Sequence, residues 1–267
     1  VEQHVDWNTG EIDFAGRGAD RGLRGITFDA GDIYIAASDE LFCYDQNFRI
    51  KRSWRNPFLK HCHEICRRDR KIFLTSTGFD SLLVFDLDRD EFTRGLHLRK
   101  TKEGWKSQLY DPKTEDGPEP GNNLHLNNVR CSKKGLFASG FRTNALIRMD
   151  AELNPSEFCS LPEGTHNSRP FKGGVLFNDT QSDCVRWVKR DGSEVNFRVP
   201  LFPEEELTHR DFDDSRVARQ GFARGLCVID ENHIAMGSSP SSISLFNLET
   251  EERIGSVNLS MDIRNAI

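Results

Sequence analysis

Residues 60–86, KHCHEICRRDRKIFLTSTGFDSLLVFD, decide the fold. They begin with polar residues around His63, continue through an apolar run at 72–74 and a turn of small residues, and end with a second apolar run at 82–85. Short apolar runs separated by turn residues are typical of β-strands joined by tight turns. The same order recurs along the chain, which predicts a repeat architecture.

Five segments align with one another. They are LRGITFDAGDIYIAAS from Leu23, CHEICRRDRKIFLTST from Cys62, LNNVRCSKKGLFASG from Leu126, NSRPFKGGVLFNDT from Asn167 and ARGLCVIDENHIAMGSS from Ala223. A third and a fourth strand-like run follow each segment, as at 81–86 and 91–98. Four short strands in each repeat of roughly 40 residues are typical of a β-propeller blade.

We therefore predict an all-β fold, a β-propeller that forms a single domain over residues 1–267. Six blades are favoured, because VDWNTGEIDFAG near the N-terminus resembles the third and fourth strands of a blade and could close a last blade shared by both termini. Five blades are the alternative. Two polar insertions, 101–123 and 204–220, are expected over one face, where long loops often act as lids.

The composition of the chain argues against some classes of binding partner. The net charge is −6 and the sequence pI is near 5.8, which argues against nucleic acid or an anionic membrane surface as a partner. No apolar run approaches the roughly 20 residues of a membrane helix, and the first residues show no signal-peptide pattern. The seven cysteines form no CxxC pair, so we expect reduced thiols in a cytoplasmic protein. The oligomeric state is left open.

Polar residues recur at the start of each repeat, at Arg24, His63, Asn127, Arg169 and Arg224. Since the first strand of every propeller blade lines the central channel, equivalent residues of different blades should converge there. A set of His, Glu, Asn and Arg side chains is costly to bury in a channel unless it is paired or solvated. The same side chains could also serve only to bind water and hold the blades together.

One hypothesis is a metal site. His63, His125 and His166 are the predicted ligands, with Glu64 as a further ligand or a general base. Imidazoles with a carboxylate suit a divalent first-row metal, so iron, zinc or manganese is favoured. A site built from Glu and Asn would instead suit calcium.

The second hypothesis, compatible with the first, is an anion site. Arg24, Arg169 and Arg224 carry planar guanidinium groups that match a carboxylate or a phosphate. Glu64, Arg169 and Arg224 are the predicted catalytic residues. The predicted substrate-binding residues are Arg24, Asn127, Asn128 and Asn167.

The third strand of three repeats ends in an aspartate, at Asp45, Asp86 and Asp150. We expect each of them to cap the following turn through side-chain to backbone hydrogen bonds.

The motifs His63–Glu64, Asn127, His166 to Arg169 and Arg224–Gly225–Leu226 resemble those of a little-characterised, mostly bacterial family of β-propeller proteins. More distantly, the layout is similar to the gluconolactonase and strictosidine-synthase group of six-bladed propellers. That resemblance implies a divalent ion in the central channel, held by Glu, Asn and Asp. The three histidines depart from this pattern and favour a softer metal than calcium.

These observations predict a metal-dependent hydrolase or lyase that acts on a small polar, anionic metabolite at the central channel. The alternative is a non-catalytic propeller that binds a peptide, a glycan or a protein partner, since this fold hosts both kinds of function.

Overall fold

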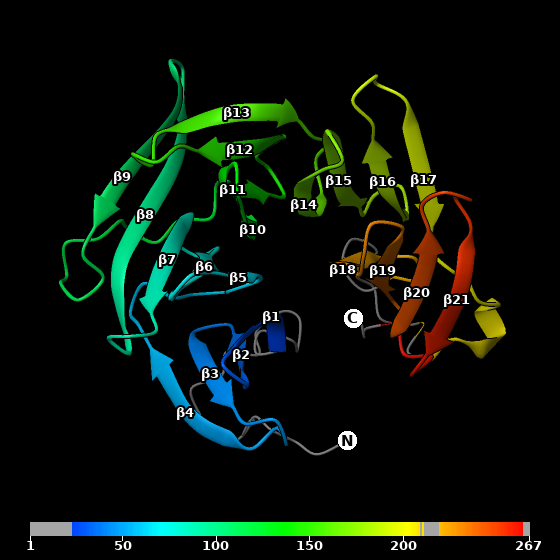
Figure 1. The fold of residues 1–267 in the computed structure, drawn as a ribbon, viewed down its shortest axis with the longest axis horizontal. Coiled ribbons are helices and arrows are strands. Elements are labelled where there is room, and N and C mark those ends of the chain that lie inside the picture. Colours follow the sequence, from blue (N-terminus) through cyan, green and yellow to red (C-terminus); the bar gives the residue numbers. More distant parts are fainter. Residues whose placement is uncertain (1–22, 209, 211–218, 264–267) are drawn as a thin grey trace. The chain divides into compact units, whose positions relative to one another are not determined.

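The apolar runs of the repeat form the strands of five antiparallel sheets in the computed structural model, which describes residues 23–208, 210 and 219–263 (Figure 1). The first sheet contains β1 (Leu23–Asp29), β2 (Asp32–Ala37), β3 (Glu40–Tyr44) and β4 (Ile50–Arg55). The second contains β5 (Ile65–Arg68), β6 (Lys71–Ser76), β7 (Ser81–Asp86), β8 (Glu91–Thr101) and β9 (Gly104–Tyr110). The third contains β10 (Leu126–Ser132), β11 (Gly135–Gly140), β12 (Ala145–Met149) and β13 (Pro155–Ser160).

The remaining sheets follow the same plan. The fourth contains β14 (Thr165–Phe171), β15 (Gly174–Asp179), β16 (Cys184–Val188) and β17 (Glu194–Arg198). The fifth contains β18 (Ala223–Val228), β19 (His233–Ser238), β20 (Ser242–Asn247) and β21 (Arg253–Asn258), and a 3-10 turn at Glu204–Glu206 precedes it. In every sheet the strands pair in sequence order, which is the meander of a propeller blade.

The chain is therefore an all-β propeller, as predicted, and its described residues form five blades, the alternative, rather than the favoured six. The N-terminal segment that was predicted to complete a shared blade lies outside the described residues. Within the described part of the chain, no helix is long and apolar enough to cross a membrane.

Burial explains the strand sequences. Leu82, Leu83, Val84 and Phe85 of β7 are all buried, because an inner strand of a blade is covered on both faces. In β17 buried and exposed residues alternate, as expected for an outer strand with one face in water.

The chain divides into two compact units. The first, Val1–Ser160, holds the first three sheets, and its apolar clusters centre on residues such as Leu83, Phe85 and Leu126. The second, Leu161–Ile267, holds the last two sheets and has its own cluster around Trp187 and Phe246.

A bulge lies at the start of the first strand in four of the sheets. The register shifts between Arg24 and Ile26, between Leu126 and Asn128, between His166 and Arg169, and between Arg224 and Leu226. Three residues inside these bulges have left-handed backbone, with φ of 65° at Gly25, 51° at Asn167 and 73° at Gly225. Gly and Asn adopt this conformation more readily than other residues, which explains the Arg–Gly pairs of the sequence.

The first insertion contributes a strand. β9 pairs with β8 at the outer edge of the second sheet, where Ser107 Oγ donates to the Leu153 carbonyl at 2.9 Å. The chain then returns to the turn between β6 and β7, where Gly121 N donates to the Gly78 carbonyl at 2.8 Å. Most of the second insertion lies outside the described residues.

The three turn aspartates behave as predicted. Asp45 Oδ1 accepts the backbone N–H of Asn47 at 2.8 Å and that of Arg49 at 2.9 Å. Asp86 and Asp150 accept backbone N–H groups in the same way. These bonds lower the pKa of the Asp45 carboxyl, with the Arg49 N–H as the largest cause.

Candidate functional site

His63 is held by two oxygen atoms at one ring nitrogen. Its Nδ1 lies 2.7 Å from the His61 carbonyl and 2.9 Å from Thr77 Oγ1. A carbonyl only accepts, so Nδ1 carries the proton and Nε2 is the basic nitrogen of the neutral ring. The backbone is fixed as well, because the N–H groups of His63 and Glu64 both donate to Thr75 Oγ1.

His125 joins His63 within the first unit. The two rings meet edge to face with centroids 5.3 Å apart, and Phe141 also meets the His125 ring edge to face, with centroids 6.0 Å apart. His125 Nδ1 lies 3.0 Å from Asn122 Oδ1, so both histidines direct Nδ1 toward an acceptor and leave Nε2 as the basic nitrogen.

Asp80 holds the segment that leads into β10. The carboxylate is 2 % exposed, and it accepts the backbone N–H groups of Asn123, Leu124 and His125 at 2.6 to 3.1 Å. Burial raises the pKa of this carboxyl, against the lowering effect of the three N–H groups. Asp80 thus links the turn of the second sheet to the position of His125.

The other predicted site residues of the first unit lie at or next to the first strands of its sheets. A Cβ on Gly25 would come within 3.0 Å of the Glu64 backbone, so the bulge after Arg24 packs directly against Glu64. Asn127 and Asn128 are buried in β10, and Asn128 Nδ2 donates to Ser139 Oγ at 3.3 Å.

The second unit repeats the arrangement around His166. The Nδ1 atom of His166 lies 3.0 Å from the Gly164 carbonyl and 2.9 Å from Thr180 Oγ1. The same reasoning gives an Nδ1–H tautomer with a basic Nε2. The His166 ring meets Phe222 edge to face at 6.1 Å, and the Arg224 guanidinium lies over the Phe222 ring, 4.8 Å from its centroid.

Asn167 and Arg169 bind the neighbouring strand. Asn167 Oδ1 accepts from Gly225 N at 3.1 Å and from Asn178 Nδ2 at 2.9 Å. Arg169 is 6 % exposed and donates to the Leu226 carbonyl at 2.8 Å. These contacts join β14 to β18.

The repeat alignment is corrected at one point. It placed Arg169 level with Arg24 and Arg224, but the strand register puts His166 there instead, one residue before the bulge. The bulges in β1, β14 and β18 each shift the register by one residue, so the misplacement came from matching one arginine with another rather than from the bulge.

The donor set fits a metal only in part. His63 and His125 could supply two imidazole nitrogens from the first unit. Among residues 23–208, 210 and 219–263, no three His, Cys, Asp or Glu side chains lie close enough together to hold one ion. The metal therefore stays a prediction.

Sequence reasoning missed the residues that support the histidines: Thr77, Asp80, Thr180 and Phe222. A signal existed for the two threonines, because each follows its histidine by 14 residues.

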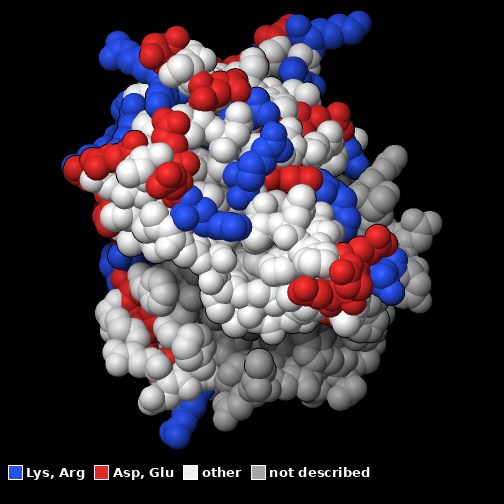
Figure 2. Space-filling view, turned by 90° about the vertical axis from the view of Figure 1, so that its right-hand side faces the viewer, with Lys and Arg blue, Asp and Glu red and all other residues white. Residues whose placement is uncertain are grey.

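Charge on the molecular surface is mixed. Lys, Arg, Asp and Glu side chains are intermixed over the face in Figure 2. Several charged side chains of the second unit form ion pairs, such as Lys189 with Glu251 at 3.1 Å. A groove of about 520 Å³ in the second unit is lined by 196–201, Phe246, Glu251 and Arg253. Exposed apolar side chains adjoin it, including Leu201 at 66 %.

No family model matches the chain, and no curated protein sequence matches it. Several solved structures share its fold. Virginiamycin B lyase from Staphylococcus aureus is 12 % identical with a TM-score of 0.53, and the match covers 90 % of this chain and 71 % of that one. A catalytically inactive histidine-to-alanine variant of the same lyase, with quinupristin, gives a TM-score of 0.54 at the same identity and coverage.

Solved structures of other proteins match with similar TM-scores. The WD40 repeats of RRP9 are 12 % identical with a TM-score of 0.53, over 91 % of this chain and 65 % of that one. A chain of a nidogen–laminin complex is 9 % identical with a TM-score of 0.59, over 90 % of this chain and 81 % of that one. At these identities the comparisons establish the fold alone: the chain is a β-propeller.

Proposed function

We propose that this protein is a lyase or hydrolase that acts on a small anionic metabolite, with His63 and His166 as the residues that transfer protons or bind metal. The observation that carries the proposal is the pair of equivalent histidines whose Nδ1 atoms each face two oxygen acceptors. A histidine held in this way offers Nε2 as a general base or as a metal ligand, the arrangement used in many enzyme sites.

The surroundings support an anionic substrate. Arg224 is only partly buried, and its stacking on Phe222 holds the guanidinium near His166. A guanidinium in such a place can bind a carboxylate or stabilise negative charge that develops during proton removal. Arg24 and Glu64 would have similar roles in the first unit, as substrate anchor and as base or ligand. Asn167 and Arg169 bind β18 instead, so we assign them mainly to holding the site in shape.

The lyase neighbour adds support of a limited kind. It is a propeller of similar topology, and a single histidine-to-alanine change makes it inactive. Elimination needs a base beside an acidic C–H bond and a group that stabilises the resulting anion, and His166 with Arg224 supplies both kinds of group.

A divalent metal remains part of the proposal, with His63 and His125 as two of its ligands and iron, zinc or manganese favoured over calcium. A bound metal would act as a Lewis acid or would activate water. The first test is elemental analysis of protein purified without chelators, for wild type, His63→Ala and His166→Ala.

Near one equivalent of a transition metal, lost in His63→Ala, is the expected result. Calcium in its place would point to Glu64 and the asparagines. Metal that is retained in both variants would show that the histidine ligand assignment is wrong.

Activity is tested with a panel of small lactones, esters and hydroxy acids. We expect His63→Gln and His166→Gln to lower kcat by about 100-fold or more, as is usual for loss of a general base. His233→Gln is the matched control, because His233 lies outside the repeat register and pairs with Asp230 on the surface. Equal activity in all three variants would contradict the proposal.

The second candidate function is a non-catalytic module that binds a protein partner. The groove beside β17 and β21 favours it, since its lining residue Leu201 and Ile254, which follows the lining residue Arg253, are both more than half exposed. A partner that wild type retains and Leu201→Asp loses, together with no activity on the panel, would favour this function over the enzyme.

We also propose a cytoplasmic location. All seven cysteines are free thiols, and the sequence offers no paired framework of the kind that secreted proteins use.

A further inference from the structure

Thr77 and Thr180 occupy the same place in two different sheets. Both side chains are buried, at 0 % and 1 % exposure, and each hydroxyl lies 2.9 Å from the Nδ1 atom of the histidine 14 residues earlier. Two repeats with different sequences therefore share one local geometry.

The direction of each hydrogen bond follows from the proton count. Thr77 Oγ1 donates to the Leu126 carbonyl, and Thr180 Oγ1 donates to the Ala223 carbonyl at 3.1 Å. A hydroxyl has one proton, so its contact with Nδ1 must be a bond that the imidazole donates. Each threonine thus accepts from a histidine in one sheet and donates to the first strand of the next.

The two acceptor carbonyls occupy equivalent positions in their strands. The Leu126 carbonyl belongs to the peptide group that begins Asn127, and the Ala223 carbonyl belongs to the peptide group that begins Arg224. Asn127 and Arg224 are the polar residues of the register in those strands. Each threonine therefore connects a histidine ring to the peptide group that carries the next polar residue.

We propose that Thr77 and Thr180 are positioning residues, which fix the Nδ1–H tautomer of His63 and His166 and set each ring relative to Asn127 and Arg224. The catalytic consequence rests on the proposed function, whereas the tautomer is a property of the folded protein alone.

The test is ring-nitrogen NMR on protein labelled with ¹⁵N-histidine, at a pH where the rings are neutral. His63→Gln and His166→Gln assign the two signals. Thr77→Val and Thr180→Val keep the side-chain shape and remove the hydroxyl, while Thr77→Ser and Thr180→Ser retain it.

Thr143→Val is the matched control. Thr143 is buried to the same degree, at 1 %, and its hydroxyl bonds only to Gly140 and Ala145 in its own turn among the contacts that the structure describes.

In wild type and the serine variants we expect a protonated Nδ1 at both histidines. In each valine variant the attached histidine should shift its tautomer ratio by about fivefold or more toward Nε2–H, because it loses one of its two acceptors. Thr143→Val should leave both signals unchanged. The proposal would be overturned if the folded valine variants gave the same ring signals as wild type, or if Thr143→Val gave an equal shift. The two sites are independent, so the test can be made with either valine variant if the other does not fold.

Activity separates this proposal from the proposed function. With a substrate from the panel, the valine variants should lower kcat by about tenfold with little change in KM, and serine should restore it. Tautomer shifts in a protein that turns over no compound of the panel would uphold the positioning role and reject the enzyme.

Discussion

Asp80 shows how a single buried side chain places part of the candidate site. One carboxylate accepts three successive backbone N–H groups of the segment that leads to His125. An N–H group that is buried without an acceptor costs about 1–3 kcal/mol, and bonds to a charged acceptor are among the stronger ones. The position of His125 therefore depends on a residue 45 positions earlier in the chain.

We expect Asp80→Ala to lower the free energy of unfolding by about 3 kcal/mol, because it leaves several N–H groups without their acceptor. Urea denaturation measures the change. Asp88→Ala is the control, since the Asp88 side chain is 64 % exposed and makes a surface ion pair with Arg70, so its loss should cost less than about 1 kcal/mol. Similar losses of unfolding free energy in the two variants would show that the hydrogen bonds to Asp80 contribute little to stability.

The cysteines differ in reactivity for physical reasons. Cys62 is fully buried, and burial raises the pKa of its thiol to about 12. Cys227 is exposed. Because the thiolate is the reactive form, iodoacetamide at pH 8 should alkylate Cys227 within minutes and leave Cys62 unmodified until the protein unfolds. Peptide mapping by mass spectrometry checks this order, and rapid labelling of Cys62 would contradict the packing around His63.

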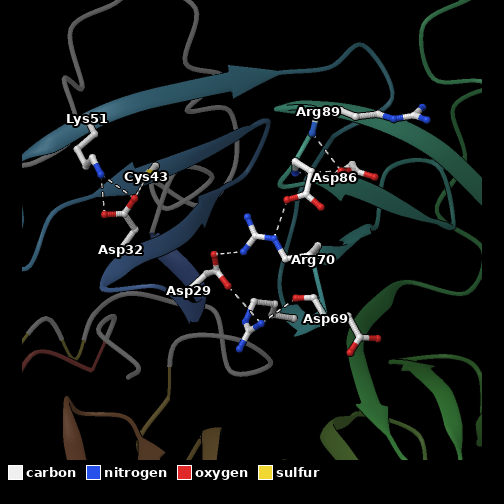
Figure 3. A network of polar contacts seen from close by, with 10 residues as sticks. Asp29, Asp32, Cys43, Lys51, Asp69, Arg70, Asp86 and Arg89 are labelled. Carbon is white, nitrogen blue, oxygen red and sulfur yellow. Dashed lines mark hydrogen bonds and ion pairs between the residues drawn. The ribbon is translucent and has the colours of Figure 1, made fainter.

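At the scale of the elements, the sheets are joined by polar contacts of two kinds. Buried ones connect first strands, as Asn167 and Arg169 do between β14 and β18. Exposed ones connect the hairpins of the first two sheets, where Asp29 pairs with Arg70 (Figure 3) and with Arg67. Exposed ion pairs contribute little, so we expect the buried contacts to hold the sheets in register.

The turn aspartates give a pH dependence with a definite sign. The pKa of Asp45 is lowered in the folded state, so its contribution to stability is present above the unfolded value of 3.8 and is lost as the pH falls through the folded pKa. Asp45→Asn should therefore destabilise the protein at pH 7 and have a smaller effect near pH 3. Unfolding curves of both proteins at the two pH values measure this, and an effect that grows on acidification would show the reverse sign.

At the scale of the whole molecule, the net negative charge argues against polyanions such as nucleic acid as binding partners. The chain carries a net charge of −6, and the face in Figure 2 shows positive and negative side chains intermixed. A nucleic-acid site needs a basic patch that releases counterions. We expect no retention on heparin at pH 7.5 in 50 mM salt, and the lowest solubility near the sequence pI of about 5.8. Salt-dependent retention on heparin would contradict this.

The sequence by itself determined the architecture. A blade is a local unit whose apolar runs, turn aspartates and Gly-containing bulges lie within roughly 40 residues, so the runs predicted in the five aligned repeats are strands in the described part of the chain. The number of blades was harder to predict, because it depends on how the ends of the chain pair rather than on any one repeat.

Only the tertiary structure decided which polar residues work together. The sequence placed His63 in the register but gave the equivalent position of the fourth repeat to Arg169 instead of His166. It also gave no indication of the Thr77 and Thr180 hydroxyls, which reach the two histidines across a hairpin. It also treated Arg169 and Arg224 alike, whereas in the structure Arg169 lies beyond the bulge of β14 and donates a hydrogen bond to the Leu226 carbonyl of β18. The periodicity of apolar residues in the sequence predicts which face of a strand a residue occupies. It does not predict the hydrogen-bond partner of that residue, because the partner changes with a one-residue shift of register and can belong to the neighbouring sheet.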